Sequence, residues 1–444
     1  MRSGTSFSFY CLVTTLFLFT LSACSNDSTD ENTIELSDAA QAGRDSFDQL
    51  LDSFIDETNV INTMVYVSNG ALSGSYSVAK GEAQPGIPMS ADHQFHIASM
   101  SKPFTATLLL QLIEEGYFTL DSTLFEVLGD ATIGELFPGY AFLRTDADGT
   151  PVANMTIDDL QRFGGESQGG SITIRQLMQH SHGMPDVTFD APNGQESLAG
   201  TTILKYAGQI NPDPAIYPDQ WSGFRLLEYY LASGLPLQSF FSPGMGYHYG
   251  DTGPVIAALI IERATGLSLA EAYRARIFDP LEMNDTYLHH YEEPRQSRSS
   301  GLSHRYFDLT RLLPGGTNVD VDADGWNTSI DWAGGGLVST AADIERFYHG
   351  LFDGSLLQNP SVIGALENRV LADDDTPYYG LGFGLQVSSA NDAVLAYEHG
   401  GFWGSYMMYI PTSGTTLTYT VNQVEFRRFD ELYERARELL VTSN

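Results

Sequence analysis

The sequence contains little positive charge. Its 444 residues include 22 lysines and arginines against 56 aspartates and glutamates, which gives a formal net charge of −34 at pH 7. Lysine occurs only at Lys80, Lys102 and Lys205. A surface this acidic repels nucleic acid and anionic lipid headgroups, so no nucleic acid is expected as a partner. The charge does not indicate a reaction, but it draws attention to any lysine placed beside apolar residues.

Cysteine is also scarce, and its scarcity excludes a disulfide-stabilised fold. Cys11 and Cys24 are the only two, and Cys11 lies in an apolar stretch, residues 7–21, that follows Arg2. This stretch is short for a membrane-spanning helix and is typical of a cleaved export signal. The mature protein would then have no disulfide, and its stability must come from burial of a core.

The apolar stretch ends in Leu21-Ser22-Ala23-Cys24, which resembles the lipobox of bacterial lipoproteins. The resemblance implies that Cys24 is lipidated and becomes the mature N-terminus. The alternative is an ordinary signal peptide that happens to contain a cysteine. We therefore predict a signal peptide over 1–23, a polar tether over 24–38 and one large domain over 39–442. The expected location is that of an exported bacterial lipoprotein, held by its lipid on a membrane at the periplasmic or extracellular face.

Both ends of the domain have the pattern of a helix beside antiparallel strands. Apolar residues recur at helical spacing from Phe47 to Ile55, and two β-rich runs flank the pair Asn69-Gly70, which is typical of a hairpin. Near the C-terminus, three runs are predicted strands and a helix follows them: 394–398, 406–410, 415–422 and 429–441. The middle, from about residue 100 to 330, is mainly helical in pattern. We therefore predict an α/β fold, an antiparallel sheet flanked by the terminal helices with an inserted helical subdomain.

A serine and a lysine lie three residues apart at the start of an apolar helix. Residues 104–113 are almost wholly apolar. Pro103 places the first helical turn close to Ser99, because proline is tolerated only where a backbone N–H lacks a helical partner. Ser99 and Lys102 then share one face. They could be only an N-cap and a surface lysine, but a lysine directly before a buried run favours a nucleophile and its general base.

Two later segments complete a pattern of three motifs. Tyr249-Gly250-Asp251 precedes a helix, and His399-Gly400-Gly401-Phe402 follows a predicted strand. Ser-x-x-Lys, Tyr-x-Asn/Asp and His-x-Gly, in this order, resemble the trio of the class C β-lactamase and DD-peptidase-like serine hydrolases, which include family VIII-type esterases. The segments 172–184, 333–340 and 379–383 are also similar to this family. The resemblance covers about residues 40–441.

The resemblance implies a fold of the β-lactamase and transpeptidase type and an acyl-enzyme formed on Ser99. Lys102 is the expected general base, and Tyr249 is expected to share the proton transfer. No cofactor is implied. The backbone N–H groups of Ser99 and Phe402 would form the oxyanion hole, beside an edge strand that carries the third motif. The expected substrate-binding residues are Asp251, His399, Gly401 and Phe402.

Asp251 departs from the family pattern, which more often has asparagine at this position. We expect its carboxylate to pair with Lys102 and raise the pKa of the lysine, which would shift part of the base role to Tyr249. His399, where dedicated β-lactamases of this type have lysine, favours an esterase or a D-amino-acid or DD-peptidase-type hydrolase acting on a small-molecule or peptide acyl substrate. The alternatives are a true β-lactamase and a catalytically silent, penicillin-binding-like protein of the envelope.

Two further features allow weaker interpretations. The spacing of four acidic residues approaches that of a calcium loop, although an acidic turn is the simpler interpretation: Asp320, Asp322, Asp324 and Asp331. Four aromatic residues of the stretch 185–242 are candidates for the walls of a substrate pocket, although core packing explains them equally well: Trp221, Phe224, Tyr229 and Tyr230.

Overall fold

The structure is a computed structural model that describes residues 36–57, 60–68, 75–214, 217–308, 320–372, 378–424 and 429–442. The predicted signal peptide, Cys24, nearly all of the tether and the pair Asn69-Gly70 lie outside these residues. The predicted lipid anchor therefore stays a prediction. In the part of the chain that is described, no helix is long and apolar enough to cross a membrane.

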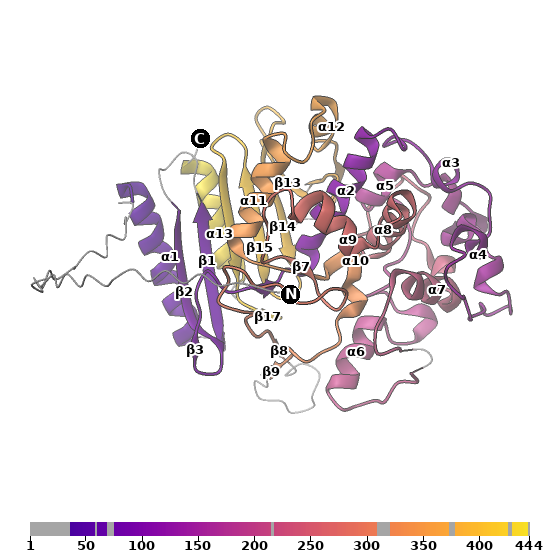
Figure 1. Cartoon of the computed structure of the whole chain (residues 1–444), viewed down its shortest axis with the longest axis horizontal. Coiled ribbons are helices and arrows are strands. Elements are labelled where there is room, and N and C mark those ends of the chain that lie inside the picture. Colours follow the sequence, from indigo (N-terminus) through magenta and orange to yellow (C-terminus); the bar gives the residue numbers. More distant parts are fainter. Residues whose placement is uncertain are drawn as a thin grey trace, which may run out of the picture. The chain divides into compact units, whose positions relative to one another are not determined.

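Nine strands of the described chain form one antiparallel sheet, in the order β11-β12-β13-β14-β15-β16-β1-β2-β3. Its centre joins the two ends of the domain, because β1 pairs with β2 on one side and with β16 on the other (Figure 1). The predicted antiparallel pairing of the two N-terminal strands is present, with Val67 of β1 opposite Tyr76 of β2. The strands are β1 (Asn62–Ser68), β2 (Tyr76–Gln84), β3 (Ile87–Pro88), β11 (Val370–Leu371), β12 (Tyr378–Tyr379), β13 (Gly384–Val387), β14 (Val394–Gly401), β15 (Ser405–Ile410) and β16 (Thr415–Thr420).

Helices cover both faces of this sheet, as the α/β prediction requires. The terminal helices α1 (Asp38–Glu57) and α13 (Phe429–Thr442) share one core with the sheet, and α11 (Ala341–Phe352) packs on the opposite face (Figure 1). Successive side chains of β15 point to opposite faces of the sheet. Met408 lies in the core that includes α1, and Met407 lies in the core that includes α11.

The predicted helical stretch is also present, and it lies beside the sheet (Figure 1). Its central helices are α2 and α8, which pack against each other and are buried along most of their length. The helices are α2 (Lys102–Glu114), α3 (Leu124–Leu128), α4 (Ile133–Leu136), α5 (Ile174–Met178), α6 (Leu198–Tyr206), α7 (Gly223–Ser233), α8 (Thr252–Thr265), α9 (Leu269–Tyr273), α10 (Trp332–Gly335) and α12 (Pro360–Ala365). Short strands join these parts: β4 (Phe95–His96), β7 (Tyr287–Leu288) and β10 (Leu337–Ser339) in one sheet, β8 (Tyr306–Asp308), β9 (Asp320–Asp322) and β17 (Gln423–Val424) in another, and β5 (Arg162–Phe163) with β6 (Glu166–Ser167).

The contact between α1 and the sheet gives a first prediction. Leu51 is fully buried there, together with Phe47 and Phe54. We expect Leu51→Ala to lower the free energy of unfolding by about 2–5 kcal/mol, because it removes buried methyl groups and leaves a cavity. Gln49→Ala, at an exposed position of the same helix, should change it by less than about 0.5 kcal/mol. Denaturant titration measures both, and equal effects of the two substitutions would contradict the predicted packing of α1.

Candidate active site

Ser99 lies in a 3₁₀ turn, η1 (Ala98–Ser101), and α2 begins directly after it at Lys102. The helix therefore starts slightly later than predicted, and its N-cap is Ser101. Ala98 has a φ of 47°, a left-handed conformation that is uncommon outside glycine and is often found at functional sites. The first N–H groups of a helical turn lack helical partners, so this turn presents backbone donors beside the Ser99 hydroxyl.

The ammonium group of Lys102 is buried and donates to three acceptors. Nζ lies 3.1 Å from Oγ of Ser99, 2.6 Å from Oδ1 of Asp251 and 2.9 Å from the carbonyl oxygen of Gly334. Burial lowers the pKa of Lys102, but the charge of Asp251 and the interaction with Tyr249 outweigh that effect, and the net pKa is raised. The expected pairing of Asp251 with Lys102 is thus present, and it stabilises the charged form of the lysine.

Tyr249 completes the group around the nucleophile. The Lys102 ammonium lies 4.7 Å from the centre of its ring. Burial raises the pKa of Tyr249, whereas the charge of Lys102 and hydrogen bonds to Lys102 and Ser99 oppose this rise without cancelling it. The ring also contacts His180, at a centroid distance of 4.5 Å. The serine and lysine of the first motif and the tyrosine of the second therefore meet at one point.

His399 lies near the end of β14, which is an internal strand for most of its length. β13 pairs with β14 only as far as Glu398, so residues 399–401 extend beyond it with one edge open. The predicted edge strand is therefore restricted to these last residues. The His399 ring is buried and bonds to the Tyr379 hydroxyl at 3.0 Å and to the carbonyl oxygen of Gly400 at 2.7 Å. Burial and the charge of Lys102 lower its pKa to about 3, which keeps the imidazole neutral.

The two glycines beside His399 have different surroundings. Gly400 is exposed, and a Cβ there would meet nothing within 4 Å, so substrate can approach its backbone. A Cβ on Gly401 would instead overlap the carbonyl oxygen of Ile97 and Oγ of Ser405. Gly401 is therefore needed where β14 packs against the segment leading into the nucleophile turn, and its expected contact with substrate stays a prediction.

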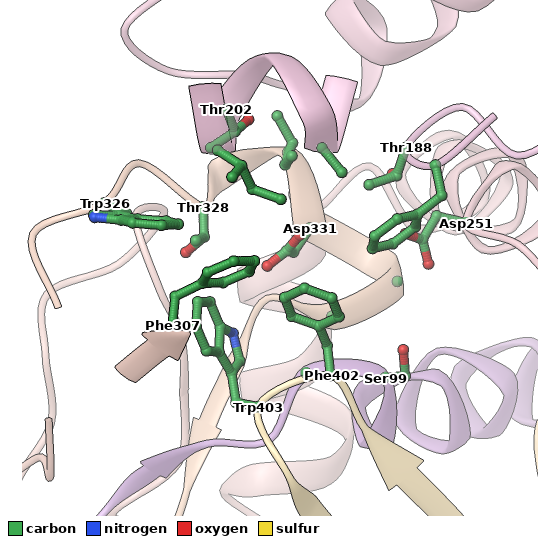
Figure 2. Close-up of a pocket in the computed structure, with 17 residues that line it drawn as sticks. Ser99, Thr188, Thr202, Asp251, Phe307, Trp326, Thr328, Asp331, Phe402 and Trp403 are labelled. Carbon is green, nitrogen blue, oxygen red and sulfur yellow. The ribbon is translucent and has the colours of Figure 1, made fainter. Parts of the chain in front are cut away.

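Phe402 lies in the turn after β14 and forms part of a pocket whose lining includes Ser99 and Asp251 (Figure 2). An oxyanion-hole donor needs an N–H group that is free to bind the substrate oxygen. Among the described residues, the backbone N–H of Phe402 is found in no hydrogen bond. The aromatic walls include Phe402, which was expected to bind substrate, and four residues that the sequence did not single out: Phe189, Phe307, Trp326 and Trp403. Of the residues expected in this role, Trp221, Tyr229 and Tyr230 are buried in the core and Phe224 packs beside it, and none lines the pocket.

The calcium-loop interpretation is wrong. Within the described ranges, no group of histidine, cysteine or acidic residues has the geometry to hold a metal ion. Asp320 and Asp322 belong to the extended strand β9, and the Asp322 carboxylate bonds to His304 Nδ1 at 2.7 Å. Asp324 follows in a turn, where its backbone N–H bonds to Asp322. Asp331 lies apart from the other three, in the pocket beside Ser99 (Figure 2).

An α/β fold with a serine, a buried lysine and a tyrosine in contact at the end of a pocket is the arrangement of a serine hydrolase of the Ser-Lys type. A family model described as Beta-lactamase matches residues 47–441. The chain belongs to this family, and it is therefore a serine hydrolase with the fold that the three motifs predicted.

Individual relatives are distant. Penicillin-binding protein 4* of Bacillus subtilis is 25% identical over 389 residues, which cover 85% of this chain and 71% of that protein. Lovastatin esterase of Penicillium rubens is 26% identical over 303 residues, covering 67% of this chain and 64% of the esterase. Among solved structures, the D-amino acid amidase from Ochrobactrum anthropi SV3 complexed with D-phenylalanine has a TM-score of 0.64 at 22% identity, covering 92% of this chain and 100% of the amidase. That similarity shows the fold.

The packing of Gly401 gives the second prediction. We expect Gly401→Ala to lower the free energy of unfolding by about 1–3 kcal/mol, because the added methyl group must displace β14 or the backbone at Ile97. Gly400→Ala is the matched control, since the same methyl group would enter open space. Thermal unfolding of both variants checks the difference. If the two glycines tolerate alanine equally, β14 does not pack against this segment as described.

Proposed function

We propose that the protein hydrolyses esters or amides through an acyl-enzyme formed on Ser99. The observation that supports this most strongly is the buried ammonium group of Lys102, 3.1 Å from the Ser99 hydroxyl and held by Asp251. Burying a charge is costly unless it is paired. A buried lysine that stays ionised next to a serine in the lining of a pocket therefore indicates that its charge acts on groups in that pocket.

In this proposal Tyr249, rather than Lys102, accepts the proton of Ser99. The raised pKa of Lys102 keeps the lysine protonated, and a protonated amine cannot act as a base. Its charge instead stabilises the phenolate form of Tyr249, which is the form able to take the proton. As the O–H bond of Ser99 breaks, Oγ attacks the carbonyl carbon, and the negative charge moves to the carbonyl oxygen.

The next steps return the site to its starting state. The backbone N–H groups of Ser99 and Phe402 would bind the oxyanion, and each such donor is typically worth about 3 kcal/mol in the transition state. Tyr249 then gives its proton to the leaving alcohol or amine as the bond to carbon breaks. A water molecule next loses a proton to Tyr249 and attacks the acyl carbon, and Ser99 leaves and is reprotonated by Tyr249.

The substrate class is proposed from the pocket and from the relatives. An esterase and a D-amino acid amidase are each named for a reaction at an acyl carbon, and a third similar protein is named for binding penicillin, which supports a reaction at an acyl carbon here. The pocket beside Ser99 is lined mainly by aromatic and aliphatic side chains, which favours a bulky apolar group next to the reacting carbonyl.

The role of Ser99 is tested by labelling with a fluorophosphonate, which reacts with activated serines. We expect a mass adduct on Ser99 in the unmodified protein, no adduct in Ser99→Ala, and a loss of p-nitrophenyl ester hydrolysis of about 10³-fold or more. Ser101→Ala, two residues along the same turn, should still be labelled at Ser99. Labelling of Ser99→Ala, or no adduct and no turnover of esters, D-peptides or nitrocefin by the unmodified protein, would contradict the proposed function.

The role of Asp251 is tested by pH dependence. Its charge raises the pKa of both Lys102 and Tyr249, so Asp251→Asn should lower both. The rising limb of kcat/KM with pH, which we assign to ionisation of Tyr249, should therefore move to lower pH by about one pH unit. Asp121→Asn removes an exposed carboxylate far from the site and should leave the profile in place. An unchanged profile in Asp251→Asn would show that the base is not coupled to this pair.

A further inference from the structure

Asp331 is an ionisable group in the pocket that the proposed reaction does not use. It ends the short turn η8 (Ser329–Asp331) and precedes α10, the helix whose residue Gly334 accepts a hydrogen bond from Lys102. An aspartate at this N-cap position commonly accepts a backbone N–H, but here no side-chain capping bond is formed. Among the described residues, no hydrogen bond or ion pair to the carboxylate is found.

The Cβ atom of Asp331 lies close to the backbone of Ala98, the residue before the nucleophile. A Cβ on Gly335 would be 3.3 Å from both the Asp331 Cβ and the carbonyl carbon of Ala98, so these two atoms are separated by no more than twice that distance. In Figure 2 the Asp331 side chain points into the pocket, toward the rings of Phe307 and Phe402. The group is thus directed into the pocket whose lining also includes Ser99.

The surroundings of this carboxylate are aromatic. Phe307 contacts Trp326 and Phe402, at centroid distances of 5.4 and 6.4 Å, and Phe402 contacts Trp403 at 5.3 Å. Burial in this pocket, and secondly the charge of Asp251, raise the pKa of Asp331 to about 7, although the charges of Arg305 and Lys102 oppose the rise. An unpaired carboxylate in such a place is costly, and a cation brought by a ligand would relieve the cost.

The protein's own cations act on Asp331 through their charges, but no ion pair with it is found among the described residues. Lys102 is bound by Ser99, Asp251 and Gly334. Arg305 is buried behind the pocket, where it lies 4.4 Å from the Trp403 ring and donates to the carbonyl of Ala323 and the hydroxyl of Thr328. It forms no ion pair with Asp331. A carboxylate bordered by aromatic rings is the chemistry that recognises an ammonium group, by charge and by cation–π contact.

We propose that Asp331 is a specificity-determining residue that binds an ammonium group on the substrate, next to an apolar or aryl portion held by the aromatic walls. The inference rests on the proposed function and narrows its substrate class to esters or amides that carry a primary or alkylated amine near the reacting carbonyl. Asp331 takes no part in bond making. Its effect is on binding and orientation.

Competitive inhibition of the hydrolysis of a neutral p-nitrophenyl ester tests this without knowledge of the natural substrate. The probes are phenethylammonium and benzyltrimethylammonium, with 2-phenylethanol as the neutral counterpart, used near pH 8, roughly one unit above the pKa of Asp331. We expect the cations to bind the unmodified protein about tenfold or more tightly than the alcohol. Asp331→Asn should abolish this preference, which is a ratio of inhibition constants and does not depend on the value of kcat/KM for the neutral ester.

Two controls separate this recognition from other effects. Asp322→Asn removes an exposed carboxylate from the same segment and should keep the preference, which excludes general attraction of cations by the acidic protein. Added salt should weaken a general attraction more than the pocket contact. Equal inhibition by cations and alcohol in the unmodified protein, or an unchanged preference in Asp331→Asn, would overturn the inference. Absence of Ser99 labelling and of ester hydrolysis would instead overturn the proposed function, and calorimetry of phenethylammonium binding would then test Asp331 independently.

Discussion

The active site depends on one buried ion pair, between Lys102 and Asp251. The lysine is the first residue of α2, the aspartate is the N-cap of α8, and the third acceptor, the carbonyl of Gly334, belongs to α10. Three elements distant in sequence are thus fixed around one ammonium group. A buried charge that loses its partner costs about 3–5 kcal/mol, so these elements cannot separate or rotate freely while the lysine remains charged.

The Lys102–Asp251 pair also restricts which residues can lie next to it. A Cβ on Gly334 would overlap the Asp251 carboxylate, so α10 can approach the pair only with glycine at this position. The packing that results places the Ser99 hydroxyl within hydrogen-bond distance of an ammonium group. Because that ammonium is stabilised in its charged form, it is suited to stabilising anions, and the proposed reaction assigns the proton transfer to Tyr249. The charges of the pair therefore determine, in the proposed reaction, which residue transfers the proton and which stabilises negative charge.

The parts of this arrangement that could be predicted are those that depend on the spacing of residues close together in the sequence. Pro103 and the apolar run after it predicted α2, and alternating runs near the C-terminus predicted β14 to β16, because helix and strand periods are properties of neighbouring residues. The order of three short motifs predicted that Ser99, Lys102 and Tyr249 meet. The contacts that could not be predicted are long-range. The pocket walls come from separate loops and strand ends, and nothing in the local sequence around Phe307 or Trp403 indicates that they share a cavity.

Asp331 shows why spacing alone gave a wrong interpretation. In sequence it follows three aspartates at the interval of a calcium loop, but β9 is extended and a turn carries the chain away, so the four residues diverge. The fold instead places both Asp331 and Asp251 in the lining of one pocket, where the two carboxylates have different neighbours. Asp251 meets a cation supplied by the protein, and their pairing organises the catalytic group. Asp331 borders aromatic rings and, among the described residues, forms no ion pair, so the charges of Arg305 and Lys102 offset its burial only in part. Two carboxylates in one pocket can thus serve catalysis and recognition separately, because the neighbours of each, rather than its chemical type, decide which charge it binds.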